Sequence, residues 1–597
     1  MKTDIAGNKK RKFHSHLEYL AVVILFAVLC SVPFLIAAIR HSYVSGDDIL
    51  THMQRVEGML SSFRAGHIPA RLHLNTLQGY AYGMGFFYPQ LLLLIPLLMR
   101  ILGINFILST NGFLILINLL TGISTYFCTF RITKSKPGAA CGAAAALFSY
   151  YRLADLLYRG SIGETTVFIF TPFLILGMYE TFQSKKTGMI WTIIGLTGIL
   201  YSHLFSFLFT VLILSLFLLA SSYIWAKNKT IRYCLCISIG ISMLLTASFW
   251  LPFFEQYFSV DILAKTGNPV SPYKPAVPFR STLRIISYWW LDLPSYLYDP
   301  ILLTYPVFLI SLFFEKKENT TIQNTAAKHE GQSTVPASQQ QGNCPRLLRS
   351  EQLRKNNTFS VILVLIGSAG FLLSSNLFPW DQFESIHRII QFPWRMMFLP
   401  ASVLPIVLSV SVSNLKKKNL QLIFLGLTAL LLGLSSIPVL KNVIDNYILL
   451  SPGYRAVLND VGAGDYLPSG STLTWIKNHE RNVYFEEEIN QNTQRSYHEE
   501  GLKAELQYSA EHDTEAEFPF LYYKGWYYQT DNHQPQPAQH GPHGLVLCKI
   551  PSSVEGSVKV FYKKTTLQWT ADILSICGAI ILGIVYHNER KKEFRNL

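Results

Sequence analysis

The chain has 597 residues, of which half are hydrophobic and only 15% are charged. Many of its apolar runs reach the roughly 18 to 25 residues that a helix needs to cross a bilayer. This composition excludes a soluble enzyme and predicts a polytopic α-helical membrane protein.

The net charge of +14 comes from short basic runs that lie between the apolar segments. These runs cover residues 9–12, 131–136, 185–186, 227–232, 316–317, 416–418 and 590–595. Basic residues gather in this way in the cytoplasmic loops of membrane proteins. We therefore expect the charge to report topology, and we expect no nucleic-acid partner.

The first apolar segment sets the orientation of the chain. A cytoplasmic basic N-terminus (residues 1–16) precedes a span at 17–39 that lacks a small-residue cleavage site, so this span is expected to be a retained anchor. A first exterior loop then covers residues 41–105. Residues 86–101 are apolar, but counting them as a crossing would put the basic run at 131–136 outside. We interpret them as a re-entrant or surface-lying helix.

The same rule places the other spans. They are expected near residues 107–130, 139–153, 165–183, 188–203, 204–225, 233–253, 298–314, 358–376, 395–413, 420–440 and 567–586. The result is a transmembrane bundle over 17–443 plus the helix at 567–586, with about twelve crossings and both termini cytoplasmic. Residues 315–357 are rich in Gln, Asn, Lys and Ser and predict a disordered cytoplasmic loop, and 587–597 form a cytoplasmic tail.

Residues 444–566 are predicted to form a small exterior β-rich domain. Apolar and polar residues alternate at 502–508 and at 558–562, as in half-buried strands. The segment 518–529 is aromatic, and its rings either bind glycan, form the core of the domain or pack it against the membrane. Of the eight cysteines only Cys548 falls here, and no CxxC pair in the chain indicates a metal or redox site.

The most informative stretch begins the first exterior loop. Read as a helix from Asp47, it carries an apolar stripe, and beside this stripe Asp48, His52 and Arg55 follow one another at i, i+4 and i+7. A carboxylate, an imidazole and a guanidinium on one helix face can take a proton from a hydroxyl and hold a phosphate. The alternative is a capping box, with Ser45 as the N-cap and Asp48 reaching back to it.

Other ionisable residues cluster at the predicted exterior ends of the spans. They are Asp155, Arg159 and Glu164 in the loop 154–164, His203 between two spans, Glu255 at the start of the loop 254–297, and His387, Arg388 and Arg395 in the loop 377–395. Such residues converge if the bundle closes around a cavity. Arg and His, like Trp and Tyr, also favour the headgroup zone for simple interfacial reasons, which is the competing interpretation.

Several motifs resemble a known family. The run GDDILTHMQRVEGMLSSFRAGHIPARLHLNTLQGYAYGMGFFYP and the segments QFPWR (391–395), GDYLP (464–468) and LYYKGW (521–526) resemble the bacterial membrane proteins called "6-pyruvoyl-tetrahydropterin synthase-related", which belong with YfhO-like proteins. This resemblance implies a bacterial plasma membrane location. The pterin name implies no function here, because the chain has no zinc-binding histidine cluster of the soluble synthase.

The architecture resembles the GT-C glycosyltransferases, which carry a catalytic acid in a long first exterior loop. This likeness implies a polyprenyl-phosphate sugar as donor, and Asp47 and Asp48 stand where that class places its acid. The chain lacks the WWD-type motif of oligosaccharyltransferases, so protein N-glycosylation is not implied.

Together these features predict an inverting membrane glycosyltransferase that acts on an envelope glycan, lipid or polymer at the exterior face. Asp48 or Asp47 would be the general base. Arg55, Arg388 or Arg395, with His52, would hold the lipid phosphate, and Asp155 and Glu164 would bind the acceptor or a divalent metal. Arg159, His203, Glu255 and His387 are the further candidate substrate-binding residues.

Two other classes of protein stay open. A transporter or flippase of lipid-linked sugars would use the same basic residues without chemistry, and it predicts broken helices with charges midway through the spans. A non-catalytic envelope assembly protein would use Asp47 and Asp48 only as helix caps, which Asn could replace.

Overall fold

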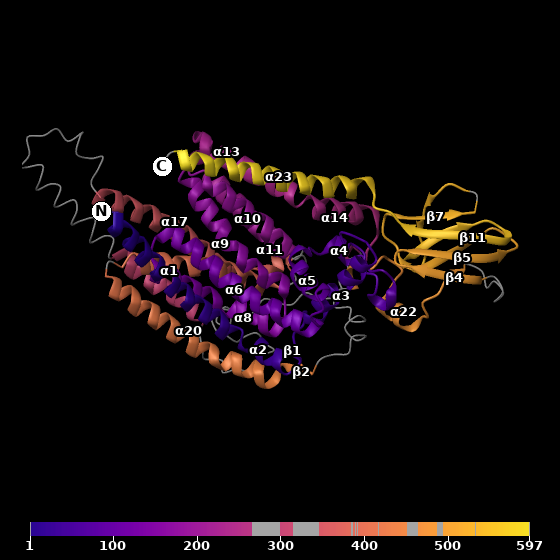
Figure 1. The fold of residues 1–597 in the computed structure, drawn as a ribbon, viewed down its shortest axis with the longest axis horizontal. Helices are drawn as coiled ribbons and strands as arrows, with labels where there is room; N and C mark the ends of the chain where they lie inside the picture. The colour runs from indigo at the N-terminus through magenta and orange to yellow at the C-terminus, as the bar shows by residue number, and fades with distance from the viewer. Residues whose placement is uncertain are drawn as a thin grey trace, which may run out of the picture.

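The computed structural model describes residues 2–265, 299–313, 345–383, 386–387, 390, 392–415, 417–450, 464–485, 494–531 and 533–595. This part of the chain is mostly helical, with a small region of sheet near the C-terminus. Figure 1 shows the strands β4, β5, β7 and β11 gathered at one end of a long helical bundle and both chain ends at the other.

Among the described residues, six helical segments are long and apolar enough to cross a membrane. They are α6 (Phe106–Thr133), α9 (Ile162–Phe182), Asn356–Leu373 within α17 (Pro345–Leu373), Pro393–Ser413, which joins η7 (Pro393–Met397) to α19 (Phe398–Ser413), α20 (Lys418–Asn446), and Thr566–Lys591 within α23 (Thr566–Arg595). In α23 only 11% of the apolar window is buried inside the protein, as expected for a helix that faces lipid.

The expected twelve crossings are not confirmed. Two of the expected spans are bent pairs, α1 (Lys2–Cys30) with α2 (Val32–Ile39) at 58° and α13 (Lys229–Leu245) with α14 (Ala247–Ser259) at 64°, and counting each as one span raises the total to eight. Others are short helices, such as α10 (Thr187–Ser202, 16 residues) and α11 (Leu204–Ala220, 17 residues). Sixteen helical residues reach about 24 Å, whereas the hydrocarbon core is about 30 Å thick.

The helix α7 (Lys136–Phe148) shows why hydropathy alone overcounts. It packs against α1, α6, α19 and α20, and every residue from Pro137 to Phe148 is buried. Its small Ala and Gly residues permit this close packing. A Cβ added at Gly142, for example, would lie only 2.9 Å from the Pro405 carbonyl oxygen. The apolar run at 139–153 therefore forms the protein's own interior and ends in α8 (Tyr150–Ala154).

The first loop is folded into short elements. They are β1 (Ser42–Val44), α3 (Ile49–Arg64), η1 (Leu77–Gly79), α4 (Met84–Phe87), η2 (Leu91–Leu93) and α5 (Leu94–Ile101). The apolar run at 86–101 thus breaks at Pro89 into pieces too short to span a bilayer. The strand β1 pairs with β2 (Ile448–Leu450), which ties the loop to the end of α20.

The capping box does not form. The helix α3 begins at Ile49, Asp48 occupies the N-cap position without a side-chain capping hydrogen bond, and Ser45 N donates to Tyr447 O at 2.7 Å. The apolar stripe of this helix, which consists of Ile49, Met53, Val56, Leu60 and Phe63, is buried as expected, except for Phe63, which is 40% exposed.

Two antiparallel sheets form the C-terminal domain. Their strand orders are β3–β6–β10–β9 and β4–β5–β11–β7–β8. The strands are β3 (Tyr484–Phe485), β4 (Gln494–Glu500), β5 (Lys503–Ala510), β6 (Thr514–Leu521), β7 (Trp526–Thr530), β8 (Gln536–Pro537), β9 (Gln539–His540), β10 (Leu545–Ile550) and β11 (Ser553–Tyr562). Phe518, Phe520, Tyr523 and Trp526 are buried, so these rings of the aromatic segment form core.

The first loop and this domain share one hydrophobic core. Phe87 stacks on Tyr466 with ring centroids 5.0 Å apart, and Phe86 lies 5.9 Å from Tyr523. Leu521 N donates to Tyr80 O at 2.8 Å. The loop and the C-terminal domain therefore lie at the same end of the bundle (Figure 1).

Further short elements connect these parts. They are η3 (Asp155–Arg159), α12 (Ser222–Lys227), η4 (Leu263–Lys265), η5 (Pro300–Leu303), η6 (Trp380–Phe383), η8 (Gly464–Tyr466) and α22 (Leu473–Asn478). Of the expected disordered loop 315–357, residues 315–344 lie outside the described residues. Residues 345–357 are helical, which contradicts that part of the expectation, because Pro345 opens α17 and a run rich in Leu, Arg and Gln follows it.

Candidate functional site

The site lies where the first loop meets the short segment between α8 and α9. That segment, η3, is a single wide helical turn that ends at Gly160 with a positive φ of 64°. A Cβ on Gly160 would lie 2.8 Å from the Ile49 Cβ, so only glycine lets the start of α3 approach this closely. Single wide turns of this kind are frequent at functional sites.

Arg159 stands at the centre of the site and contacts three carboxylates. Its Nη1 donates to Asp155 Oδ1 at 2.6 Å and to Glu164 Oε2, while its Nη2 lies 3.5 Å from Asp48 Oδ2. Its guanidinium also lies over the Trp394 ring, 4.7 Å from the centroid. One planar cation thus joins the first loop, η3 and α9.

The three carboxylates differ in their access to water. The side chains of Asp155 and Glu164 are 1% and 2% exposed, whereas that of Asp48 is 43% exposed. Burial, and next the charge of Glu164, raise the pKa of Asp155 well above its ordinary value. Asp48 is therefore the carboxylate of this set that a substrate can reach.

Glu164 also contacts a second arginine. Arg395 Nε lies 3.8 Å from Glu164 Oε1, and Tyr151 donates its hydroxyl to the same oxygen at 3.3 Å. The Arg395 guanidinium lies over the rings of Phe392 and Phe205, at 4.8 and 5.2 Å from their centroids. These contacts bring the QFPWR segment into the site.

Arg55 and His52 form a second group of polar side chains at the site. Arg55 Nη1 donates to His52 Nδ1 at 3.2 Å, Nη2 donates to Pro89 O at 2.5 Å, and the guanidinium lies 4.1 Å from the centroid of the Tyr88 ring. Arg55 is buried, its Nε has no hydrogen-bond partner in the described part of the chain, and burial lowers its pKa to about 10. Burial and the Arg55 charge lower the pKa of His52 well below its ordinary value, so His52 is neutral and accepts at Nδ1.

His203 lies near Arg55 and His52, because its ring centroid is 6.3 Å from that of Tyr88. It is the N-cap residue of α11, where its Nδ1 accepts from Ser206 N at 3.3 Å. Of the sequence-predicted residues, the site brings together Asp48, His52, Arg55, Asp155, Arg159, Glu164, His203 and Arg395.

The other predicted residues lie elsewhere or are not described. Asp47 is exposed just before α3. Glu255, on α14, accepts from Thr565 Oγ1 at 2.9 Å and so ties α14 to the start of α23. The ring of His387 lies 5.6 Å from that of Trp380, and Arg388 lies outside the described residues.

Sequence reasoning missed the aromatic residues of the site, namely Tyr88, Tyr151 and Trp394. Tyr88 and Trp394 each stand beside a proline in a motif noted above, GFFYP and QFPWR, which could have drawn attention to them. Tyr151 lies in an apolar run and carries no such signal.

A metal site is not evident among the described residues. No group of three or more His, Cys, Asp or Glu side chains in the described ranges could hold an ion. Asp155 and Glu164, which were considered as ligands, both direct a carboxylate oxygen at Arg159.

No protein-family model matches the chain, and no curated protein matches it. The function considered below therefore depends on the geometry of this site.

Changing Glu164 to Gln should destabilise the protein strongly. The substitution leaves the buried Arg159 and Arg395 short of one negative charge, and breaking a buried pair from one side typically costs about 3–5 kcal/mol. Asp48→Asn should cost at most about 1 kcal/mol, because Asp48 is 43% exposed and 3.5 Å from Arg159. Thermal unfolding of both variants in detergent measures the difference, and equal losses would contradict the central place of the Glu164–Arg159 pair.

The stability of the protein should fall as the pH falls below about 6.5, partly because of His52. An unfolded histidine takes up a proton there, whereas the folded His52 stays neutral, so the unfolded state gains up to about 1.4 kcal/mol per pH unit. His52→Asn, which keeps an acceptor for Arg55, should reduce the difference in melting temperature between pH 7.5 and 5.5. The exposed His479→Asn serves as control, and an unchanged pH dependence in His52→Asn would refute the assignment.

Proposed function

We propose that the protein is an integral membrane glycosyltransferase that moves a sugar from a polyprenyl-phosphate donor to an envelope glycan, lipid or polymer at the exterior face. One observation carries this proposal: Asp48 is a water-accessible carboxylate held next to a buried set of arginines. A reaction that needs a base and releases a phosphate anion fits that pairing.

Asp48 acts as the general base in this proposal. Its carboxylate takes the proton of an acceptor hydroxyl while the hydroxyl oxygen forms a bond to the anomeric carbon of the donor. The bond between that carbon and the phosphate oxygen breaks, and polyprenyl phosphate leaves with the electron pair. A single displacement of this kind inverts the anomeric centre.

Arg55 and Arg395 hold the departing phosphate. Arg55 contacts an imidazole, a carbonyl oxygen and a tyrosine ring, and no carboxylate pairs with it among the described residues. Its Nε is a buried donor without a partner there. A phosphate oxygen would satisfy this donor and balance the buried charge.

Asp155 and Glu164 act as positioning residues rather than as ligands of the acceptor or of a metal. Both are buried against Arg159, which in turn lies 3.5 Å from Asp48. Their contacts fix the position of the Arg159 guanidinium beside Asp48.

The arrangement of the parts supports the proposed GT-C-like architecture, which is expected from a long first loop and a C-terminal domain. The first loop and the C-terminal domain share a core at one end of the bundle, opposite both chain ends (Figure 1). The absence of a side-chain cap at Asp48 also weakens the view that this residue only starts a helix, on which the assembly-protein alternative depends.

A transporter of lipid-linked sugars is the second candidate, and one cluster favours it. Arg152 is fully buried in the bundle, where it donates to Asn118 Oδ1 at 2.5 Å and to Leu147 O at 3.1 Å. Asn118 donates in turn to Ser31 Oγ at 2.9 Å, at the bend between α1 and α2. A buried charge beside a broken helix is typical of transporters.

Asp48→Asn separates the two candidates. A general base contributes about 10²- to 10⁴-fold to the rate, so the variant should transfer labelled sugar from a polyprenyl-phosphate sugar to envelope acceptors at least about 100-fold more slowly. Asp47→Asn, exposed and next in the chain, is the matched control and should keep most activity, with membrane levels of both variants checked. Full activity of Asp48→Asn would contradict the transferase, and movement of the intact donor across vesicles without transfer would support the transporter.

A further inference from the structure

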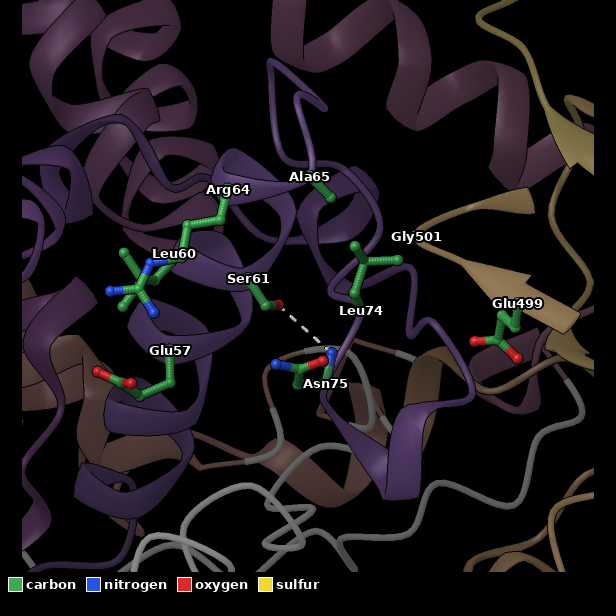
Figure 2. A pocket seen from close by; sticks show the side chains of 9 residues that line it. All are labelled: Glu57, Leu60, Ser61, Arg64, Ala65, Leu74, Asn75, Glu499 and Gly501. Atoms are coloured by element: carbon green, nitrogen blue, oxygen red, sulfur yellow. Dashed lines mark hydrogen bonds between the residues drawn. The ribbon is translucent and has the colours of Figure 1, made fainter. Parts of the chain in front are cut away.

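A pocket of about 380 Å³ lies on the opposite side of α3 from the site described above. Glu57, Ser61 and Arg64 of α3 form one wall, Asn75 closes it from the loop, and Glu499 faces it from the C-terminal domain, as Figure 2 shows. Positions 57, 61 and 64 are spaced at i, i+4 and i+7 and share a helix face, which is roughly opposite the face of His52 and Arg55.

The two carboxylates of the pocket are already neutralised. Glu57 receives Arg100 Nε on one oxygen and Arg100 Nη2 on the other at 3.1 Å. Glu499 receives Arg481 Nη2 at 2.6 and 2.7 Å and the Tyr497 hydroxyl at 2.8 Å. Carboxylates that are paired in this way attract a cation only weakly. Each retains lone pairs that can accept from a hydroxyl group.

The remaining polar groups of the pocket include both donors and acceptors. The Arg64 guanidinium and the Asn75 carboxamide have no side-chain hydrogen bond in the described part of the chain. Ser61 Oγ donates to Gly58 O at 2.8 Å and accepts from Asn75 N at 3.4 Å, as the dashed line in Figure 2 shows. Leu60 and Leu74 supply apolar surface between these groups (Figure 2). A neutral ligand with many hydroxyl groups and an apolar face matches this lining, and a pyranose ring has both.

We propose that this pocket is a binding subsite for a neutral saccharide. That it holds part of the acceptor glycan rests on the proposed function. Asp48 and Ser61 are thirteen residues apart on or next to α3, which is about 20 Å along the helix. An acceptor that occupies both places is therefore an extended glycan, not a single sugar or a simple lipid alcohol.

The subsite also joins two parts of the protein. Glu57, Ser61 and Arg64 belong to the helix that begins at Asp48, whereas Glu499 and Gly501 belong to the β4–β5 hairpin. A ligand that contacts both stabilises their contact, because it binds the folded arrangement and not the separated parts.

Oligosaccharide binding to the purified full-length protein in detergent tests this proposal. The probes are cellotetraose, maltotetraose and chitotetraose, measured by saturation-transfer NMR and titration calorimetry. Ala65→Trp fills the pocket from the end of α3 while leaving the residues of both ion pairs unchanged, and Ile68→Trp, 59% exposed and outside the lining, is the matched control. At least one probe should bind wild type and Ile68→Trp, and Ala65→Trp should weaken it at least tenfold.

A second variant keeps the test decisive if Ala65→Trp does not fold. Asn75→Ala removes one exposed carboxamide and should weaken the same probe about threefold or more, with an unchanged melting temperature. Binding of no probe, equal binding to Ala65→Trp, or preferential binding of inorganic phosphate would each overturn the proposal. If the probes bind as expected but Asp48→Asn keeps full transfer activity, the saccharide subsite stands and the proposed transferase fails.

Discussion

One buried guanidinium determines the rest of this site. Arg159 contacts Asp48 of the first loop, and it contacts Asp155 and Glu164, which lie on either side of it in the chain, in η3 and at the start of α9. This arrangement brings the backbones of the two segments together. A Cβ on Gly46 would lie 2.7 Å from the Arg159 carbonyl carbon, and Gly160 is equally crowded against Ile49. Asp48 N donates to Arg159 O at 2.7 Å, so main chain and side chain hold the same junction. Because the Asp48 side chain stays 43% exposed, the junction keeps one carboxylate accessible to water.

The first loop, which forms the Asp48–Arg159 junction near its start, also contacts the C-terminal domain. The first loop continues from α3 into the rings that pack against Tyr466 and Tyr523. A separate ion pair fixes the loop to the last helix: Arg71 Nη2 lies 2.5 Å from Asp572 Oδ1, and Ser248 Oγ donates to the same carboxylate oxygen at 2.6 Å. The first loop thus contacts the site, the domain and α23, and Glu255 of α14 adds a contact to the start of α23 outside the loop.

The sequence predicted much of this, and its failures have physical causes. The lengths of the apolar runs located the helices. They could not show that α7 is buried in protein, because hydropathy does not distinguish lipid from protein interior. They also could not show the bends between α1 and α2 and between α13 and α14. Helical spacing placed His52 and Arg55 on one face correctly. The charged residues at the ends of the predicted spans included Glu164 and Arg395, which lie in the site. They also included Glu255, which contacts the start of α23 instead. Position along a span is readable from sequence, whereas the direction in which a residue points within the bundle depends on packing.

The measurement that tests the account most directly is binding of a short-chain polyprenyl phosphate to the purified protein, compared with the polyprenyl alcohol of the same length. If the buried arginines hold a lipid phosphate, the phosphate should bind at least tenfold more tightly than the alcohol. Arg55→Gln should abolish this difference, while Asp48→Asn should preserve it, because Asp48 acts on the acceptor and not on the phosphate. Equal binding of phosphate and alcohol, or an unchanged preference in Arg55→Gln, would contradict the assignment of this site.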